Sequence, residues 1–288
     1  MFSIIIPTWN NLSYLKCCIE SIHKNSNYNH QILVHVNENK DDTVDYLKQK
    51  SIEHTYTPYN SGICEGVNMA SKKSMFEYIL YSHDDMYFCP NWDIELEKEI
   101  KSFKDNKFYL SSTMIGYEGP NSLDCGDKIS NFNEKKLINN FKQILFKDFQ
   151  GSTWAPHVIH KEYWEKVNGF SEEFFPGTGS DPDLNKKLWD VGIRIFKGSS
   201  KSRVYHFGSK TLRKDKSFIG SRGSKLFHLK WGISINFFKK FYLRSNTLYY
   251  GALTEPNKNI IFTLNYIIER IKYFYIKYVY NYNNKLKF

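Results

Sequence analysis

Two adjacent carboxylates, Asp84 and Asp85, follow an apolar run over residues 78–81 that predicts a buried strand. Two negative charges at the end of a strand repel each other unless a cation lies beside them. A divalent ion that joins them to a diphosphate would remove that repulsion. The alternative is a solvated or helix-capping turn, for which paired Asp residues are also suited.

A second pair of carboxylates, Asp181 and Asp183, flanks Pro182 at the start of a helical pattern over residues 181–191. Because proline suits the first turn of a helix, we expect Asp181 at the N-cap and Asp183 inside the first turn. Capping alone would explain Asp181, although a capping carboxylate can also do chemistry.

Strands and helices alternate along the first two hundred residues, which predicts an α/β fold with a Rossmann-like, mostly parallel sheet flanked by helices. We expect strands over residues 2–7, 31–36, 53–57, 78–81, 108–115 and 204–207. We expect helices from residue 12 onward and over residues 41–50, 62–73, 90–103, 134–145 and 181–191. The pattern weakens over residues 116–148, where a long insertion suggests an acceptor loop or lid.

Ligands bind at the carboxyl edge of such a sheet, where each strand turns into the following helix. The first strand brings Pro7, Thr8 and Asn10 to this edge, and the second brings the Asn-Glu-Asn run at residues 37–39. The strand over residues 78–81 brings His83 and the two carboxylates that follow it. Polar groups from three strands therefore converge on one edge, which predicts a binding site there.

The chain has a net charge of +10 and a pI near 9.1, with its basic residues concentrated after Lys197. This charge favours anionic partners, namely nucleotide diphosphates, acidic lipid surfaces or nucleic acid, and the absence of a nucleic-acid-binding motif argues against the last. Five cysteines without a CxxC pair argue against a disulfide framework or a zinc site. With an N-terminus that does not resemble a signal peptide, we expect a cytoplasmic protein.

Four segments occur in the order found in family 2 glycosyltransferases, and the chain resembles that family over about residues 2–210. They are SIIIPTWN at residues 3–10, Asn60-Ser-Gly with Asn68, YILYSHDD at residues 78–85, and the GFSEEFF and GSDPDL runs within residues 169–184. The resemblance implies a GT-A catalytic domain over residues 1–215. Nucleotide-sugar binding would fall in about residues 1–115 and the acceptor and base region in about residues 116–215.

The resemblance also implies a role for each matching residue. The nucleotide sugar, with a UDP-sugar as the expected donor, would contact Pro7, Thr8, Asn10, Glu38, Asn60, Asn68, His83 and Asp84. Asp85 and His206 would hold Mn²⁺ or Mg²⁺, which would neutralise charge on the leaving diphosphate. Asp181 would accept the proton of the attacking hydroxyl, with Asp183 as the competing base, and attack opposite the leaving group would invert the anomeric centre.

Trp154 and His157, which precede the GFSEEFF run, are acceptor candidates in this fold. The alternative for Trp154 is burial in the core. The sequence departs from the family in two places. Glu38 stands in a turn that is usually rich in Asp, so the choice of nucleobase is open. Ser180 stands where Glu is common, which removes one acidic group beside Asp181.

A helical C-terminal appendage is expected over residues 216–288, rich in aromatic and basic residues. Its segments 226–250 and 260–280 resemble interfacial amphipathic helices that would bring the enzyme to an anionic membrane surface. In the first segment this prediction rests on Trp231, Phe237, Phe238, Phe241 and Tyr242 beside Lys230, Lys239, Lys240 and Arg244. The alternative is that both helices pack on the catalytic domain or on a second subunit.

Together these features predict a metal-dependent inverting glycosyltransferase that acts on a glycan or lipid-linked acceptor in cell-surface polysaccharide or lipopolysaccharide synthesis. It would be cytoplasmic or peripheral at the inner face of the membrane. The alternatives are a non-catalytic nucleotide-sugar or glycan-binding protein on the same scaffold, and a nucleotidyltransferase. The turn after the first strand lacks the Gly-rich basic loop that a nucleotidyltransferase needs.

Overall fold

The computed structural model describes residues 1–118, 122–208 and 222–280. Its centre is a nine-stranded sheet in which eight strands follow the order β3-β2-β1-β4-β8-β6-β9-β5, and β7 pairs with β9. The strands are β1 (Ser3–Trp9), β2 (Gln31–Asn37), β3 (Glu53–Thr57), β4 (Tyr78–Tyr81), β5 (Met86–Phe88), β6 (Phe108–Ile115), β7 (Phe149–Gln150), β8 (His157–His160) and β9 (Ile195–His206).

The first four strands form the parallel half of the sheet, as the alternating pattern predicts. β1 pairs in parallel with β2 and with β4, and β2 pairs in parallel with β3. Ile4, Ile5 and Ile6 of β1 are fully buried, because helices cover both faces of a parallel sheet. β1 therefore lies in the middle of the core, and its pairing with β2 and β4 aligns the carboxyl ends of these strands.

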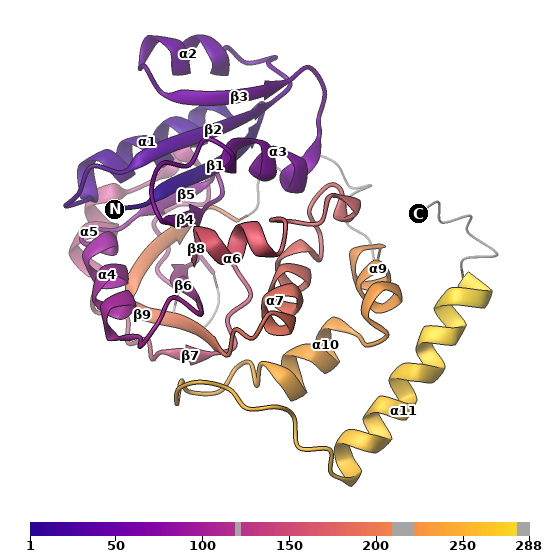
Figure 1. Cartoon of the computed structure of the whole chain (residues 1–288). Helices are drawn as coiled ribbons and strands as arrows, with labels where there is room; N and C mark the ends of the chain where they lie inside the picture. Colours follow the sequence, from indigo (N-terminus) through magenta and orange to yellow (C-terminus); the bar gives the residue numbers. More distant parts are fainter. Residues whose placement is uncertain (119–121, 209–221, 281–288) are drawn as a thin grey trace.

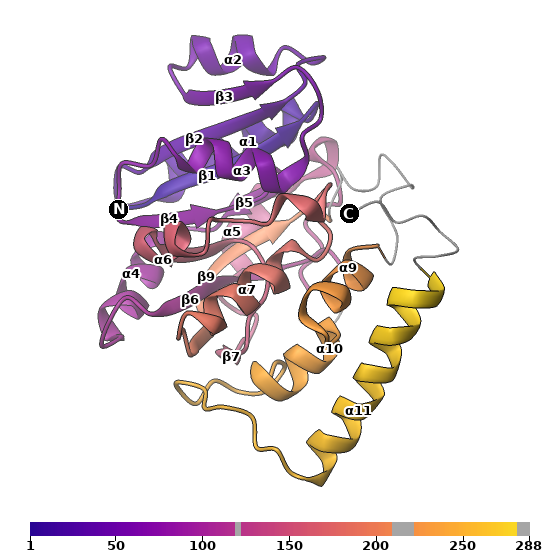
Figure 2. The same ribbon diagram turned by 45° about the vertical axis from the view of Figure 1, so that its right-hand side comes forward.

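Helices α3, α6 and α7 cover one face of the sheet and α1 lies on the other (Figures 1 and 2). The helices of this part are α1 (Leu12–Asn25), α2 (Thr43–Gln49), α3 (Gly62–Ser71), α4 (Trp92–Ser102), α5 (Glu134–Asn140), α6 (Lys161–Lys166) and α7 (Ser180–Asp190), with 3-10 turns at Ile129–Asn131 and Glu172–Phe174. α1 buries Leu15, Ile19 and Ile22, which recur at helical spacing. The expected helices are confirmed, with ends that differ by a few residues.

The second half of the sheet is mixed. β8 runs antiparallel to β4 and β6, and β5 runs antiparallel to β9, whereas β6 and β9 are parallel. The short strand expected over residues 204–207 is the end of the longer β9, and β5, β7 and β8 were not expected. Because β8 is antiparallel, its first residue, His157, lies opposite Tyr81 at the carboxyl end of β4.

The insertion over residues 116–148 packs against the β5–β9 end of the sheet and forms a second small core. This core contains Tyr87, Cys89, Ile115, Cys125, Leu137, Phe141, Tyr205 and Phe207. The side chain of Glu134 ties α5 to the rest of the domain, because it accepts a hydrogen bond from Tyr87 and pairs with Lys24 of α1. The described part of the insertion is therefore packed onto the sheet.

The C-terminal region begins, within the described residues, with α9 (Arg222–Trp231), α10 (Ile235–Phe237) and a π-helical turn (Phe238–Tyr242). Phe227, Phe237 and Phe238 are buried in the same hydrophobic core as the sheet. Trp231, Phe241 and Tyr242 are partly buried against this core, so the packing favours the alternative in which residues 226–250 pack on the catalytic domain. The expected boundary at residue 215 lies outside the described residues.

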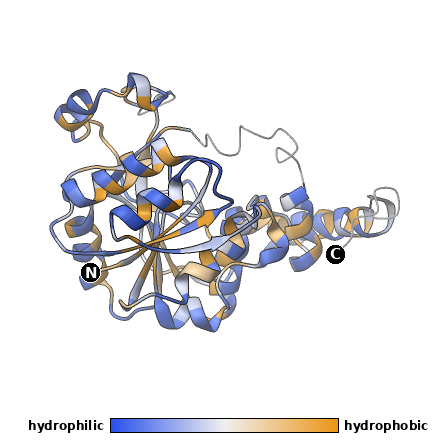
Figure 3. Cartoon of the chain, turned by 90° about the horizontal axis from the view of Figure 1, so that it is seen from above, coloured by the Kyte–Doolittle hydropathy of each residue, from blue (hydrophilic) through white to orange (hydrophobic). Residues whose placement is uncertain are grey.

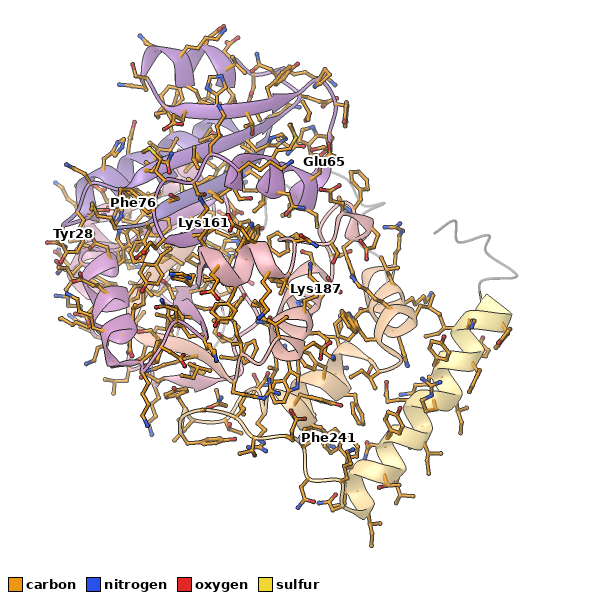
Figure 4. The ribbon with its side chains drawn as sticks, in the orientation of Figure 1. Tyr28, Glu65, Phe76, Lys161, Lys187 and Phe241 are labelled. Carbon is orange, nitrogen blue, oxygen red and sulfur yellow. The ribbon has the colours of Figure 1, made fainter. Side chains whose placement is uncertain are left out.

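The last described helix, α11 (Ile260–Phe274), continues as a π-helical turn (Tyr275–Tyr280) and is the outermost element of the molecule (Figures 1 and 2). It contacts α10 through Phe262, whose ring lies 5.2 Å from those of Phe237 and Phe241. Phe241 lies between α10 and α11 (Figure 4). Within the described ranges no helix combines the length and apolar character needed to cross a bilayer.

Candidate active site

The carboxyl ends of β1, β2 and β4 meet at one edge of the sheet, as their parallel pairing requires. Trp9 at the end of β1 lies opposite Asn37 at the end of β2, and Ser82 after β4 donates its N–H to Ile5. Asn37 accepts hydrogen bonds from the backbone and hydroxyl of Ser61 before α3. We call this edge of the sheet the rim.

Glu38 forms one wall of the rim together with the residues that follow β1. Its carboxylate accepts hydrogen bonds from the indole N–H of Trp9 at 2.7 Å and the amide of Asn10 at 3.3 Å. The hydrogen bond from Trp9, with further support from Lys40, holds the pKa of Glu38 below its usual value. Asn10 and Glu38 both have positive φ angles, 49° and 54°, so two sharp turns aim these side chains at each other.

Asp84 is buried behind the same rim. Its Oδ2 accepts a 2.7 Å hydrogen bond from the hydroxyl of Thr8, a residue that is 76 positions away in the chain. Thr8 is also buried, so its hydroxyl is shielded from water and serves to orient Asp84. Pro7 lies inside β1 and is buried, where its role is to end the apolar run.

His83, Asp85 and His206 form a compact cluster, with one possible ligand atom from each lying within 4.8 Å of the others. The antiparallel register of β5 and β9 places His206 opposite Met86, and therefore beside Asp85, whose Oδ1 lies 3.3 Å from Nε2 of His206. The sequence predicted Asp85 and His206 as ligands but assigned His83 to the nucleotide. The structure places His83 in the same cluster, which we call the cation cluster.

The donor set of this cluster fits a divalent transition metal. Two imidazole nitrogens and a carboxylate oxygen suit Mn²⁺, whereas Mg²⁺ prefers oxygen ligands alone. Burial lowers the pKa of His83 to about 4, so its ring is neutral near pH 7 and keeps a lone pair for a metal. Asp85 is buried, and a buried carboxylate needs such a positive partner.

Asp181 lies in the first turn of α7, close to the expected place but not at the N-cap. The N-cap is Gly179, whose φ of 85° suits glycine, and the helix begins at Ser180. Pro182 falls two residues into the helix, which is allowed because the first N–H groups have no partner within the helix. The prediction of Asp181 as the N-cap residue is therefore wrong, and within the described part of the chain the start of α7 has no side-chain capping hydrogen bond.

The carboxyl group of Asp181 is desolvated. Asp181 as a whole is partly buried, but its Oδ1 is enclosed and has no hydrogen-bond partner among the described residues. Burial raises the pKa of Asp181 to about 7. A carboxyl group that titrates near neutral pH and has an open acceptor atom has the properties of a general base.

Asp183, the competing base, has a different environment. Its Oδ2 accepts a hydrogen bond from Ser171, and its Oδ1 accepts one from the indole of Trp231 at 2.8 Å and lies 3.0 Å from Nζ of Lys230. Both carboxylate oxygens are therefore engaged by the protein. Since Trp231 and Lys230 belong to α9, Asp183 joins the catalytic domain to the C-terminal region.

Tyr81 and Tyr109 are buried between strands that reach the site. The ring of Tyr81 lies 5.4 Å from that of His83. Burial raises the pKa of both tyrosines, and the charge of Asp181 adds to the rise in each. His157 lies against both tyrosine rings, with centroid distances of 5.2 and 4.5 Å, and its Nδ1 bonds the Tyr109 hydroxyl. The two halves of the site therefore share one wall.

Buried polar atoms near this wall have no hydrogen-bond partner among the described residues. They are Nε2 of His157 and both side-chain amide atoms of Asn185, one turn beyond Asp181 on α7. Burial lowers the pKa of His157 to about 3, so its ring is neutral. Tyr109 and Asn185 were missed by the sequence analysis because their residue types, in β6 and mid-helix, carry no motif.

Three other predicted residues have structural partners. Asn68 makes three hydrogen bonds to Phe170 and Glu172, so its side chain supports that loop. Asn60 accepts a hydrogen bond from the N–H of Gly62 in the turn before α3. The indole N–H of Trp154 donates to the carbonyl of Ser112, which favours the core role considered for it.

Lys187 of α7 anchors the loop before the base helix. Its ammonium group reaches the carbonyl oxygens of Val167 and Gly169, and Figure 4 shows it on the face of α7 below α3. On the far side, Arg222 of α9 donates to the carbonyl of Phe175 at 2.6 Å. Residues 167–183 are therefore held from two sides, which fixes the place of Asp181.

Comparison with known proteins gives a family match and several structural neighbours. The family model described as "Glycosyl transferase family 2" matches residues 3–163. An uncharacterized glycosyltransferase of Rickettsia prowazekii is 28% identical over 178 residues, which is 60% of this chain and 54% of that protein. One from Rickettsia bellii is 28% identical over 116 residues, which is 38% of this chain and 16% of that protein. The chain thus spans about half or less of these relatives.

Two solved structures have similar folds. Residues 1–349 of S. aureus TarS, in complex with UDP, align with a TM-score of 0.58 at 12% identity, covering 100% of this chain and 75% of that one. GalNAc-T7 with UDP, GalNAc and Mn²⁺ aligns with a TM-score of 0.60 at 14% identity, covering 98% and 57%. At these identities the likeness shows the GT-A fold alone, which confirms the predicted fold class.

Proposed function

Because the chain belongs to glycosyl transferase family 2, we propose that it transfers a sugar from a UDP-sugar to a hydroxyl group of a glycan or lipid-linked acceptor, with inversion at the anomeric carbon. The observation that carries this proposal is the desolvated Asp181, whose Oδ1 has no hydrogen-bond partner among the described residues, in a domain that also holds the His83, Asp85 and His206 cluster. Family membership favours sugar transfer over the nucleotidyl transfer considered as an alternative.

The nucleotide part of the donor binds along the rim, between Glu38 and Asp84. Glu38 is held as an acceptor by Trp9 and Asn10, which suits it to take hydrogen bonds from a base or ribose. UDP as the nucleotide is supported by TarS, which was solved with UDP and with UDP-GlcNAc.

His83, Asp85 and His206 are the residues that would hold a divalent cation, and Mn²⁺ fits their ligand types best. When bound, the cation neutralises the charge that grows on the leaving diphosphate. The presence of Mn²⁺ beside UDP in GalNAc-T7 supports the same choice here.

Asp181 accepts the proton of the acceptor hydroxyl while that oxygen attacks the anomeric carbon. The new C–O bond forms as the bond from the anomeric carbon to the diphosphate oxygen breaks, and UDP leaves with both electrons. Attack from the side opposite UDP inverts the anomeric centre. Burial keeps the pKa of Asp181 near 7, so a proton can move to it without a large penalty at neutral pH.

The acceptor lies against His157, Tyr109 and Asn185. Unpartnered buried polar atoms are costly, and sugar hydroxyls would satisfy Nε2 of His157 and the amide of Asn185 when the acceptor binds. An acceptor in cell-surface polysaccharide or lipopolysaccharide would have such hydroxyls. We assign Trp154 a supporting role in this wall, since its indole N–H is already used.

A donor screen tests the proposal. Release of UDP from UDP-glucose, UDP-galactose and their N-acetylhexosamine counterparts is measured with Mn²⁺, for the wild-type chain, Asp85→Ala and Asp181→Asn. Asp190→Asn, an exposed carboxylate on the same helix, is the matched control. We expect Asp85→Ala to lose metal-dependent UDP binding. Asp181→Asn should retain UDP binding but lose about 10²–10⁴-fold in turnover.

Two outcomes would contradict the proposal. Wild-type turnover in both site variants would show that the assigned roles are wrong. Binding of UDP by the wild-type chain with no release of UDP from any donor, in the presence of water or a sugar acceptor, would favour the non-catalytic binding protein.

A further inference from the structure

Helix α11 buries Phe262 and Glu269 and exposes most of its apolar residues to solvent. Its buried side is held by Glu269, which lies 3.4 Å from Nε2 of His228 and accepts the N–H of Ser234 at 2.6 Å. The same side of α11 buries one large apolar side chain, that of Phe262. A helix that only covers a core has the opposite orientation, with its apolar stripe inward.

The outward face is broad and apolar. At about 100° per residue, its members fall within an arc of about 140°. They are Ile260, Ile261, Leu264, Ile267, Ile268, Ile271, Phe274, Tyr275 and Tyr278, all exposed. In Figure 3 orange segments recur along this helix where it extends from the body of the molecule. Contiguous exposed apolar surface of this extent marks an interaction site.

Basic residues border the apolar arc on both sides. By the same geometry Lys272 lies beside one edge, and Arg270 and Lys277 lie beside the other. The whole segment 216–288 contains 13 Lys and Arg residues and 2 Asp and Glu residues, a net charge of +11, so the rest of the chain is close to neutral. The positive charge of this protein is therefore concentrated in the C-terminal region, to which α11 and the turn after it contribute Arg270, Lys272 and Lys277.

We propose that α11 lies flat on an anionic phospholipid bilayer, with its apolar arc among the acyl chains and its basic border at the headgroups. A helix with this pattern inserts about 5–10 Å into the interface without crossing it. The charge distinguishes a bilayer from a second copy of the chain, because two regions of charge +11 repel each other whereas an anionic surface attracts both. The proposal does not depend on the proposed sugar transfer.

The surface also differs from the one the sequence suggested. In residues 226–250 the rings of Phe227, Phe237 and Phe238 are buried in the domain, so we assign the bilayer contact to α11. The contact between His228 and Glu269 and the edge-on ring contacts of Phe262 with Phe237 and Phe241 then join the docked helix to the catalytic domain.

Flotation of the full chain with vesicles tests the proposal. Vesicles of phosphatidylcholine alone are compared with vesicles that also contain phosphatidylglycerol. The test variant is Leu264→Asp with Ile271→Asp, two residues that are 58% and 64% exposed. The control is Met75→Asp with Leu145→Asp, which makes the same chemical change at residues that are 70% and 87% exposed elsewhere. Thermal melting checks that each variant is folded.

We expect the wild-type chain and the control to float with anionic vesicles and much less with neutral ones. The test variant should partition roughly tenfold or more weakly. Lys272→Glu with Lys277→Glu should also weaken binding by roughly tenfold or more, since each basic residue near an anionic surface strengthens binding about fivefold. This second variant keeps the apolar arc intact, so it gives an answer even if the first does not fold.

Three results would overturn the proposal. The first is a wild-type chain that does not bind anionic vesicles. The second is equal binding by the test variant and the control. The third is a wild-type dimer that the test variant converts to a monomer without any vesicle binding, which would assign the face to a second copy. The assay needs no donor or acceptor, so these results are separate from those of the donor screen.

Discussion

Replacing Asp181 with Asn should stabilise the protein at neutral and alkaline pH while it removes activity. The folded protein has to keep this carboxyl group in a desolvated place, where its pKa rises from 3.8 to about 7. A shift of about three pKa units corresponds to about 4 kcal/mol, the free-energy cost of holding the ionised form at high pH. Asn carries no charge and avoids that cost.

The sign of the pH dependence follows from proton binding. Between the unfolded pKa near 4 and the folded pKa near 7, the native state binds a proton that the unfolded chain has released. The free energy of unfolding of the wild-type chain therefore falls as pH rises through this window and then levels off. Asp181→Asn lacks this fall, so the two proteins should diverge as pH rises from 4 to 8.

Thermal melting from pH 4 to pH 8.5 measures the effect. Allowing for the amide's own burial, we expect Asp181→Asn to be more stable at pH 8 by about 1–4 kcal/mol, or about 2–8 °C in melting temperature. The exposed carboxylate of Asp190, changed to Asn on the same helix, should give no such divergence. Parallel melting curves for Asp181→Asn and wild type at every pH would refute the desolvation of Asp181.

Two further predictions concern residues that position the site. Thr8→Val removes the hydroxyl that bonds Asp84 and keeps the shape of the side chain. The affinity for UDP, measured by calorimetry, should therefore fall about 5–30-fold with little change in the fold. An unchanged affinity would show that Asp84 is not part of the donor site. Trp231→Phe removes the indole N–H that donates to Asp183 and should lower the free energy of unfolding by about 1–3 kcal/mol. Tyr278→Phe, on the exposed face that α11 begins, should leave the free energy of unfolding unchanged. Equal denaturation midpoints for Trp231→Phe and the wild-type chain would show that this bond adds no stability.

The parallel half of the fold could be predicted because its signals are local. The buried run of β1, the helical spacing of α1 and the polar residues after β4 each lie within a few consecutive positions. Parallel strands that end at one edge then bring Thr8 and Asp84 together, although 76 residues separate them.

The rest depended on pairings between distant strands. The antiparallel register of β8 with β4 places His157 beside Tyr81, and no local pattern around residue 157 indicates that partner. His83 joined the cation cluster for a similar reason, since its neighbour His206 arrives from β9. The sequence pattern around Phe237 and Phe238 is the same in a membrane-bound helix and in a helix packed on a core. Their burial in the structure favours the core.

The contacts of Asp183 determine how this chain can be divided. A fragment that stops before α9 would lose the hydrogen bond from Trp231 and the contact with Lys230, and Asp183 would keep the bond from Ser171. It would also uncover the surface that Phe227 and Phe238 now shield. We therefore expect a stable shortened version to keep the chain at least through Leu253, the last core residue before α11.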